Sequence, residues 1–107
     1  TDPVIRQRFA QIAIEAQVLR LLAFRGLTTA MKSGEPGPEG SLGKWLWADI
    51  NQSLTTLAMD VKGPSAQLVD DVWTYRFLRA RANSIEGGTT EILKNIVAER
   101  VLGLPRG

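Results

Sequence analysis

The sequence predicts an all-α protein, and three observations support that prediction. Apolar residues recur every three or four positions through two long stretches, which is the period of an amphipathic helix. No stretch alternates steadily between polar and apolar residues, as a half-buried strand would. Glycine and proline residues separate the periodic stretches and limit each helix. We therefore expect two long antiparallel helices joined by a short turn, followed by two shorter helices.

The first long helix is expected to begin at Pro3. Asp2 is a favourable N-cap residue, and proline fits the first helical position because its missing N–H would have no helical partner there. The helix should stop near Gly34, which gives it a length of roughly 45 Å at about 1.5 Å per residue. A helix of that length needs packing partners along its whole extent. Its apolar positions are Ile5, Phe9, Ile12, Ala16, Leu19, Ala23, Leu27 and Ala30.

A segment rich in proline and glycine, GEPGPEG at residues 34–40, joins the first helix to the second. Its composition is typical of a turn, and nothing in it indicates a domain boundary. The second helix is expected to start at Glu39 or Ser41 and to run to Lys62, where Gly63-Pro64 stops it. Its apolar positions are Leu42, Leu46, Ile50, Leu54, Leu57 and Val61.

The third helix is shorter and follows a polar connection. Asp70 or Asp71 is expected to supply its N-cap, and the helix should continue to about Ala82. Its apolar and aromatic positions are Val72, Trp73, Tyr75, Phe77 and Leu78.

The fourth helix is expected to open at Thr89 or Thr90, to continue to about Leu102 and to end at Gly103 and Pro105. Two long helices and two short ones enclose only a thin core. We therefore expect apolar surface that another segment or subunit covers, and we expect the chain on its own to self-associate.

Composition excludes several classes of chemistry. The chain has 107 residues, of which 44% are hydrophobic and 22% charged, so residues 1–107 are expected to form one unit with a modest core. It contains neither cysteine nor histidine, which removes disulfides, thiolate nucleophiles, histidine bases and Cys/His metal sites, and no metal site is expected. Carboxylates, lysines, hydroxyl groups and Tyr75 remain for chemistry.

Charge and hydropathy restrict the expected partners. The net charge is +2, from 13 basic and 11 acidic residues, and there is no run of Lys or Arg. These features argue against nucleic-acid binding. No apolar run is long enough to span a bilayer, so no membrane span is expected. A cytoplasmic location agrees with the lack of cysteine, although that lack alone decides nothing.

Two further groups of residues have a structural interpretation. Arg76, Arg79 and Arg81 lie close in sequence to acidic residues, which favours ion pairs or a subunit interface over a nucleic-acid patch. The three tryptophans stand at helical spacing, which is more typical of a core or an interface than of a stacking platform.

The most informative stretch is RANSIEGGTTEILKNIVAERVLGLP, residues 81–105. An acid, Glu86, precedes the pair Gly87-Gly88, and Thr89 and Glu91 stand at the start of the next helix. In a structural interpretation the glycines form a turn, the threonine caps the helix and the second glutamate complements the helix dipole. In a functional interpretation free N–H groups at the helix start hold an anion or polarise a carbonyl, and a nearby carboxylate acts as a base. The local pattern leaves both interpretations open.

The whole tail resembles the C-terminal end of the acyl-CoA dehydrogenase family. The similarity covers the arginine-rich helix, the Gly-Thr turn, the helix start TEI and the ending AERVLGLP. The earlier stretch EPGPEGSLGKWLWADINQSLTTLAMDVKGP is similar to actinobacterial branches of the family. The resemblance spans essentially the whole chain but only the last quarter or so of a family member. It implies that residues 1–107 are a single partial domain, the C-terminal helical bundle without its first helix.

The resemblance implies a flavoenzyme. Family members bind FAD and oxidise an acyl-CoA to its trans-2-enoyl-CoA, as a carboxylate removes the α-proton and the β-hydrogen leaves as hydride to the flavin. A backbone N–H and a ribityl hydroxyl of FAD hold the thioester carbonyl. Family members form oligomers, usually dimers of dimers, with an electron-transfer flavoprotein as electron acceptor. The complete protein would act on fatty or steroid side-chain acyl-CoAs, whereas this chain alone would be inactive and would not bind FAD tightly.

Residue by residue, the family's Tyr-Glu-Gly-Thr turn matches Glu86-Gly87-Gly88-Thr89. The position of the catalytic base is therefore Gly87, which has no carboxylate, and the resemblance implies a base on an earlier helix outside this chain. The backbone N–H of Gly87 still matches the group that polarises the thioester carbonyl. Glu86 takes the neighbouring aromatic position and is a second candidate for the base. Gly88, Thr89 and Glu91 match positions where the family contacts FAD.

Two other functions stay open. The missing carboxylate at Gly87 fits a non-catalytic subunit of a mixed tetramer, as does the stretch DVKGPSAQLVDD, which replaces the family's glycine-rich loop for the neighbouring subunit's FAD. A stand-alone helical interaction or scaffold protein that has lost flavin chemistry is the alternative from another class. The start at Thr1, without a methionine, favours a truncated chain over a complete short protein.

Overall fold

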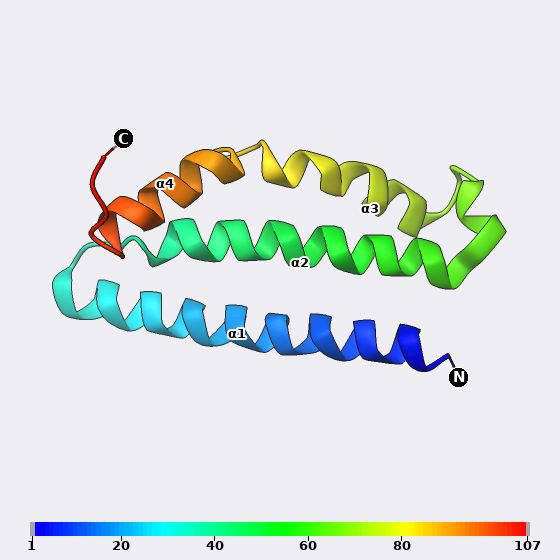
Figure 1. The fold of residues 1–107 in the computed structure, drawn as a ribbon, viewed down its shortest axis with the longest axis horizontal. Helices are drawn as coiled ribbons and strands as arrows, with labels where there is room; N and C mark the ends of the chain where they lie inside the picture. The colour runs from blue at the N-terminus through cyan, green and yellow to red at the C-terminus, as the bar shows by residue number, and fades with distance from the viewer. Residues whose placement is uncertain (1, 107) are drawn as a thin grey trace.

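The computed structural model describes residues 2–106, and in this part of the chain it contains four α-helices, two short 3-10 helices and no strand. The two long helices run antiparallel, and the two shorter ones return along the other side of the second helix (Figure 1). This arrangement confirms the predicted all-α fold. The interpretation of Thr1 lies outside the described residues. The elements are α1 (Pro3–Ser33), α2 (Glu39–Lys62), η1 (Gly63–Gln67), α3 (Val72–Ala80), η2 (Arg81–Ser84) and α4 (Thr90–Arg100).

The helix starts follow the predicted caps. The carboxylate of Asp2 accepts a hydrogen bond from the Val4 N–H at 2.8 Å, and Pro3 is the first residue of α1. Of the two aspartates before α3, Asp71 is the cap, because its side chain accepts from the Trp73 N–H at 2.7 Å. Thr89 caps α4. Each cap satisfies one backbone donor that a helix leaves without a partner.

Two predicted helix ends need correction. The third helix stops being α-helical at Ala80 and continues as the 3-10 helix η2, because the N–H groups of Ile85 and Glu86 both donate to the Ala82 carbonyl and tighten the last turn. The fourth helix ends at Arg100, two residues before the expected end. The polar connection that was expected after the second helix begins with the 3-10 helix η1.

The central element is α2, which packs against α1, α3 and α4. The half-buried positions of α1 alternate in steps of three and four residues, which is the spacing of a two-helix seam. An ion pair of 2.6 Å between Arg8 and Asp60 also joins α1 to α2. The half-buried positions of α1 are Ile5, Arg8, Ile12, Glu15, Leu19, Leu22, Gly26, Thr29 and Ala30.

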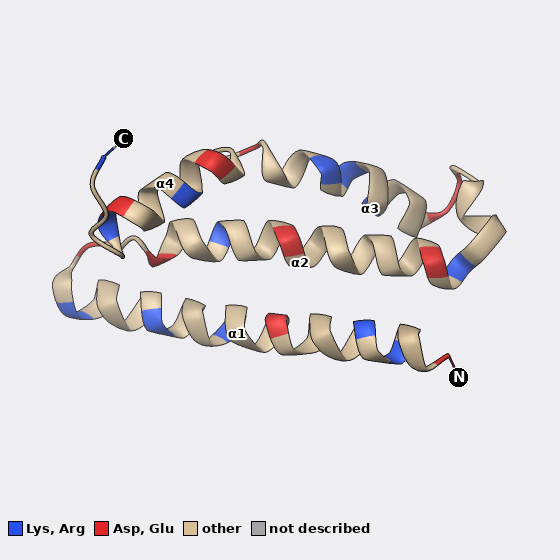
Figure 2. Cartoon of the chain, in the orientation of Figure 1, with Lys and Arg blue, Asp and Glu red and all other residues tan. Residues whose placement is uncertain are grey.

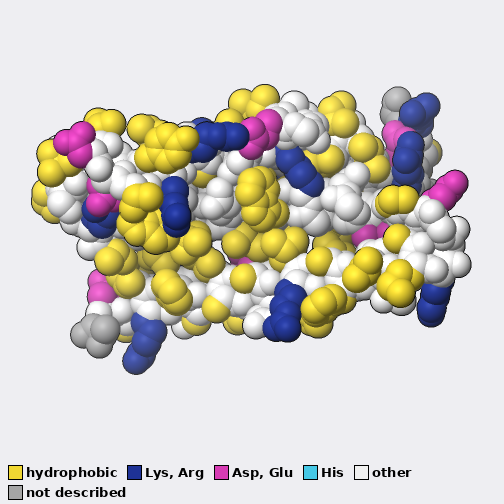
Figure 3. All heavy atoms as spheres, turned by 180° about the vertical axis from the view of Figure 1, so that it is seen from behind, with side chains coloured by type: hydrophobic (Ala, Val, Ile, Leu, Met, Phe, Trp, Pro, Cys, Tyr) yellow, Lys and Arg dark blue, Asp and Glu magenta, His cyan; other side chains and the backbone are white. Residues whose placement is uncertain are grey.

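The core is thin, as predicted, and it centres on α2. No residue of α1 is fully buried, and Phe9 and Leu27, which were expected on its packed stripe, are 60% and 58% exposed. The reason is that α2 alone covers α1, and it covers only one side of that stripe. Apolar side chains are spread over the back of the molecule, most densely at the end where α1 begins (Figure 3). The buried apolar residues are Ala48, Ile50, Leu57, Ala80, Leu93 and Val97.

Basic and acidic residues both occur along α2 and α4, whereas α1 is mainly basic, with Glu15 as its acidic residue (Figure 2). In the described residues, no helix combines the length and the apolar character that crossing a membrane requires.

Candidate functional site

The glycine turn, which we define as residues 85–89, connects η2 to α4 and lies beside α2. Gly87 has φ 66° and Gly88 has φ 106°, backbone conformations that residues with a side chain rarely adopt. The hydroxyl of Thr89 then caps α4 by accepting a hydrogen bond from the Ile92 N–H at 3.3 Å. Glu91 is exposed in the first turn of α4, where its charge complements the helix dipole. The structure therefore brings the four predicted residues Gly87, Gly88, Thr89 and Glu91 to one place.

A run of backbone N–H groups in the turn has no partner. Within residues 2–106, the N–H groups of Gly87, Gly88 and Thr89 donate to no carbonyl or side-chain oxygen. The first N–H groups of α4, those of Thr90 and Glu91, have no partner inside the helix by construction. Successive free N–H groups at a helix start form a site of positive potential for an anion or for a carbonyl oxygen.

Two polar side chains of α2 hold the turn in place. The ammonium of Lys44 donates to the Asn83 carbonyl at 2.6 Å and to the Gly88 carbonyl at 2.9 Å. The side-chain amide of Asn51 donates to the Asn83 side-chain oxygen at 2.6 Å. Asn83 is buried, with 4% of its surface exposed, so these partners satisfy polar groups that water does not reach.

Glu86 lies at the edge of this network, in an ion pair. Its two carboxylate oxygens accept hydrogen bonds from the guanidinium of Arg79 at 2.7 and 3.2 Å, and one of them also accepts from the Asn83 amide at 2.7 Å. The hydrogen bond from Arg79, followed by that from Asn83, lowers the pKa of Glu86, and the same pair raises the pKa of Arg79. A carboxylate with a lowered pKa is a weaker base. The role of Glu86 as the base stays a prediction, and the ion pair of Glu86 with Arg79 argues against that role.

The other two arginines of α3 and η2 lie over aromatic rings of α3. The guanidinium of Arg76 lies over the Trp73 ring at 5.1 Å, and that of Arg81 lies over the Phe77 ring at 4.6 Å. Together with the Arg79–Glu86 ion pair, these contacts agree with a structural interpretation of the arginines.

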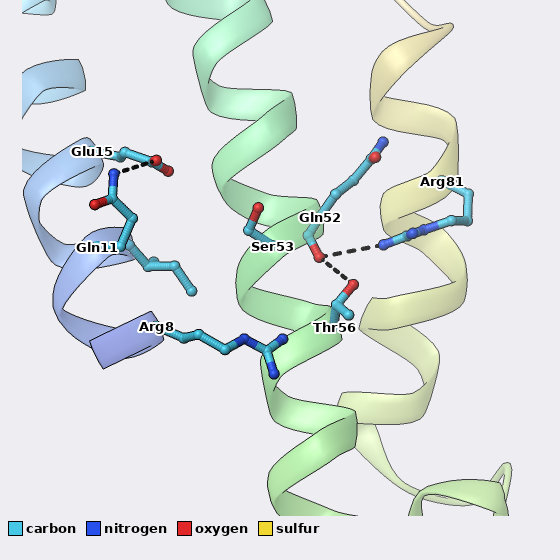
Figure 4. Close-up of a pocket in the computed structure, with 8 residues that line it drawn as sticks. Arg8, Gln11, Glu15, Gln52, Ser53, Thr56 and Arg81 are labelled. Atoms are coloured by element: carbon cyan, nitrogen blue, oxygen red, sulfur yellow. Dashed lines mark hydrogen bonds between the residues drawn. The ribbon is translucent and has the colours of Figure 1, made fainter. Parts of the chain in front are cut away.

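A polar depression of about 390 Å³ is lined by residues of α1 and α2 and by Arg81 of η2 (Figure 4). Several of its polar groups already have partners: Gln11 donates to Glu15 at 2.9 Å, and Arg8 pairs with Asp60, which lies outside the lining. In the described residues, no group of three or more acidic side chains is placed to hold a metal ion. The glycine turn is therefore the better candidate for a ligand site.

Sequence reasoning missed Lys44 and Asn51 as parts of the site. A signal for them exists, because a spacing of seven residues places both on one face of a helix. Local sequence does not tell that this face meets residues 83–88, which lie 32 to 44 positions further along the chain.

Comparisons with known proteins show the family to which this chain is similar. The family model for the C-terminal domain of acyl-CoA dehydrogenases matches residues 1–102. Acyl-CoA dehydrogenase IpdE1 of Mycolicibacterium smegmatis is 39% identical over 98% of this chain and 26% of its own length. The protein of the same name from Mycobacterium tuberculosis is 39% identical over 98% of this chain and 28% of its own length.

A third relative, acyl-CoA dehydrogenase FadE34 of Mycobacterium tuberculosis, is 34% identical over 98% of this chain and 15% of its own length. The chain thus spans about a quarter of the first two relatives and less of the third. No solved structure matched it. The match to the family model covers nearly the whole chain, and the fold agrees with it; the chain belongs to the acyl-CoA dehydrogenase family, as its all-α C-terminal domain.

Proposed function

We propose that the complete protein is an FAD-dependent acyl-CoA dehydrogenase that oxidises an acyl-CoA to its trans-2-enoyl-CoA. This chain, a single partial domain, would supply part of the flavin-binding and subunit-interface surface and would be inactive alone. The observation that supports the proposal is the glycine turn: free N–H groups of Gly87, Gly88 and Thr89 at the start of α4, in a chain of this family.

The turn fits an anionic group such as the diphosphate of FAD. Gly88 has no side chain to block the approach of a ligand to the backbone, and Thr89 and Glu91 offer polar side chains beside the free N–H groups. We assign Gly88, Thr89 and Glu91 to this contact. Bound FAD would supply the hydride acceptor of the reaction.

The backbone N–H of Gly87 is assigned to the thioester carbonyl of the substrate. Removal of the α-proton moves negative charge onto that carbonyl oxygen, and a preoriented N–H stabilises the charge without reorganising. Gly87 brings no carboxylate, so the base comes from a part of the protein outside this chain. The expected fatty or steroid side-chain substrate, the electron-transfer flavoprotein, the oligomeric assembly and the cytoplasmic location belong to the same proposal.

The proposal is tested on the complete gene product. We expect it to purify with flavin absorbance that an acyl-CoA bleaches in the absence of oxygen. Thr89→Val should lower the flavin content, whereas Thr89→Ser keeps the hydroxyl and should retain it. Thr28→Val, at an exposed threonine of α1, is the matched control. A complete gene product that folds, holds no flavin and takes up none from solution would contradict the proposed function.

One observation supports a variant of this function, a non-catalytic subunit in a mixed tetramer. The position that carries the base in many family members is Gly87, without a carboxylate. Purification of the complete gene product with and without the neighbouring dehydrogenase subunits of its genome distinguishes the two. Bleaching of the flavin by acyl-CoA in the homo-oligomer would exclude the non-catalytic role.

A further inference from the structure

We infer that Lys44 is a positioning residue for the glycine turn, and that its ammonium sets the direction of the Thr89 N–H at the proposed flavin contact. The inference rests on the proposed function for its consequence for flavin binding. The structural part of the inference, that Lys44 fixes the orientation of the peptide group between Gly88 and Thr89, rests on a contact within this chain.

The side chain of Lys44 bonds one backbone carbonyl before the glycine turn and one within it. Its ammonium bonds the Asn83 carbonyl before the turn at 2.6 Å and the Gly88 carbonyl within it at 2.9 Å. A Cβ built on Gly87 would lie 3.7 Å from the Lys44 Cε, so the lysine stem passes close to Gly87. In residues 2–106, no other side chain of α2 bonds a carbonyl of residues 83–89.

The bond to the Gly88 carbonyl determines where the next N–H points. The C=O and N–H of a trans peptide lie in one plane and point in opposite directions. All peptide bonds described are trans. Since the Gly88 carbonyl points toward Lys44 on α2, the N–H of Thr89 points away from α2, to the side where it has no partner within the described residues.

A pair of glycines needs a hydrogen bond from another element to fix its backbone more than other residues do. Glycine adopts positive and negative φ with similar ease, so the peptides around Gly87 and Gly88 have low intrinsic barriers to other orientations. The structure keeps φ at 66° and 106°, and the bond from Lys44 to the Gly88 carbonyl opposes a rotation of the peptide between Gly88 and Thr89.

The charge of the ammonium adds to this effect. A cation bonded to a carbonyl polarises the peptide, which increases the partial positive charge on its N–H. Asn51 supports the same turn through the side chain of Asn83, but it does not bond the glycine backbone.

The test uses the complete gene product with Lys44→Met, which keeps the length of the stem and removes the charge and the donors. We expect the flavin content to fall several-fold while the yield of folded protein stays as in the wild type, because a misdirected Thr89 N–H loses its proposed contact with the FAD diphosphate. Lys44→Arg, which restores the charge and the donors, should recover much of the loss. Lys32→Met, at an exposed lysine of α1, is the control.

A crystal structure of Lys44→Met provides a readout that does not depend on activity. We expect the Gly88 carbonyl to rotate away from its wild-type direction. An unrotated carbonyl, or a wild-type flavin content in Lys44→Met, would overturn the inference. If the wild-type protein holds no flavin, the proposed function fails, and the direction of the carbonyl alone decides the role of Lys44. If Lys44→Met does not fold, Lys44→Gln takes its place under the same readouts.

Discussion

At the scale of single residues, Gly88 has a backbone conformation that restricts the choice of side chain. Its φ of 106° lies beyond the left-handed helical region, whereas the φ of 66° at Gly87 lies inside it. Space is a lesser constraint, because a Cβ on Gly88 would meet Leu93 Cδ2 at 3.5 Å, an ordinary contact distance. The need for glycine at position 88 is therefore conformational.

This difference predicts the effect of alanine. Gly88→Ala should destabilise the protein by about 1 to 3 kcal/mol, the usual cost of forcing a side chain into a sparsely populated conformation. Gly40→Ala is the matched control, because Gly40 is helical and a Cβ there would meet no atom within 4 Å. The control should stabilise by up to about 1 kcal/mol. Urea denaturation measures both, and equal stabilities for the two variants would contradict this explanation.

The ion pair of Glu86 predicts a dependence of stability on pH. Its hydrogen bonds with Arg79 and Asn83 lower the pKa of the folded state below the ordinary value of 4.5. A lowered carboxyl pKa contributes stability that is fully present above the unfolded pKa and is lost as the pH falls through the folded pKa. Glu86→Gln removes this contribution, so the variant should lose less stability than the wild type on acidification.

Thermal denaturation of both proteins from neutral to acidic pH checks this prediction. The pKa of Asp71 is also lowered, by its hydrogen bonds with Lys62 and the Trp73 N–H, so Asp71 likewise contributes stability that is lost on acidification. This contribution is present in both proteins. The comparison between wild type and Glu86→Gln therefore isolates the glutamate. Parallel pH profiles for the two proteins would show that the Arg79–Glu86 pair is too solvated to matter.

At the scale of elements, the sequence predicted what local chemistry determines. The cap at Asp2, the stop at Gly63-Pro64 and the cap at Thr89 each depend on residues within one helical turn, and each is found in the structure. The predicted end of the third helix lies beyond the observed one at Ala80, because the change to the 3-10 helix η2 depends on two N–H groups that share the Ala82 carbonyl. No propensity of the residues in that segment indicates this sharing.

The contacts between elements were harder to predict. Periodicity identifies an apolar stripe on α1, but it does not tell which side of the stripe the one neighbour covers, so Phe9 and Leu27 were expected to be packed and are exposed. The hold of α2 on the glycine turn was missed for the same reason. Lys44 and Asn51 meet residues far along the chain, and only the fold brings them together. The location of the site was predictable, but the residues that support it were not.

At the scale of the whole molecule, the long helix α1 is the least covered element. The molecule measures 49 by 26 by 25 Å, and α1 runs along its length on one side with only α2 beside it (Figure 1). Large apolar side chains of α1 remain more than half exposed, including Phe24 at 53% and Met31 at 79%. Uncovered apolar surface of this kind is typical of a protein that packs against something else.

We therefore predict that the isolated chain self-associates through α1. Leu27→Glu places a charge on the exposed apolar side of α1 and should shift the chain toward monomer, since a carboxylate does not desolvate without a partner. Gln17→Glu adds the same charge at an exposed polar position of α1 and should leave the association unchanged. Sedimentation equilibrium over a range of concentrations measures both variants. A wild-type chain that stays monomeric at high concentration would refute the prediction, and an equal effect of both variants would place the contact elsewhere.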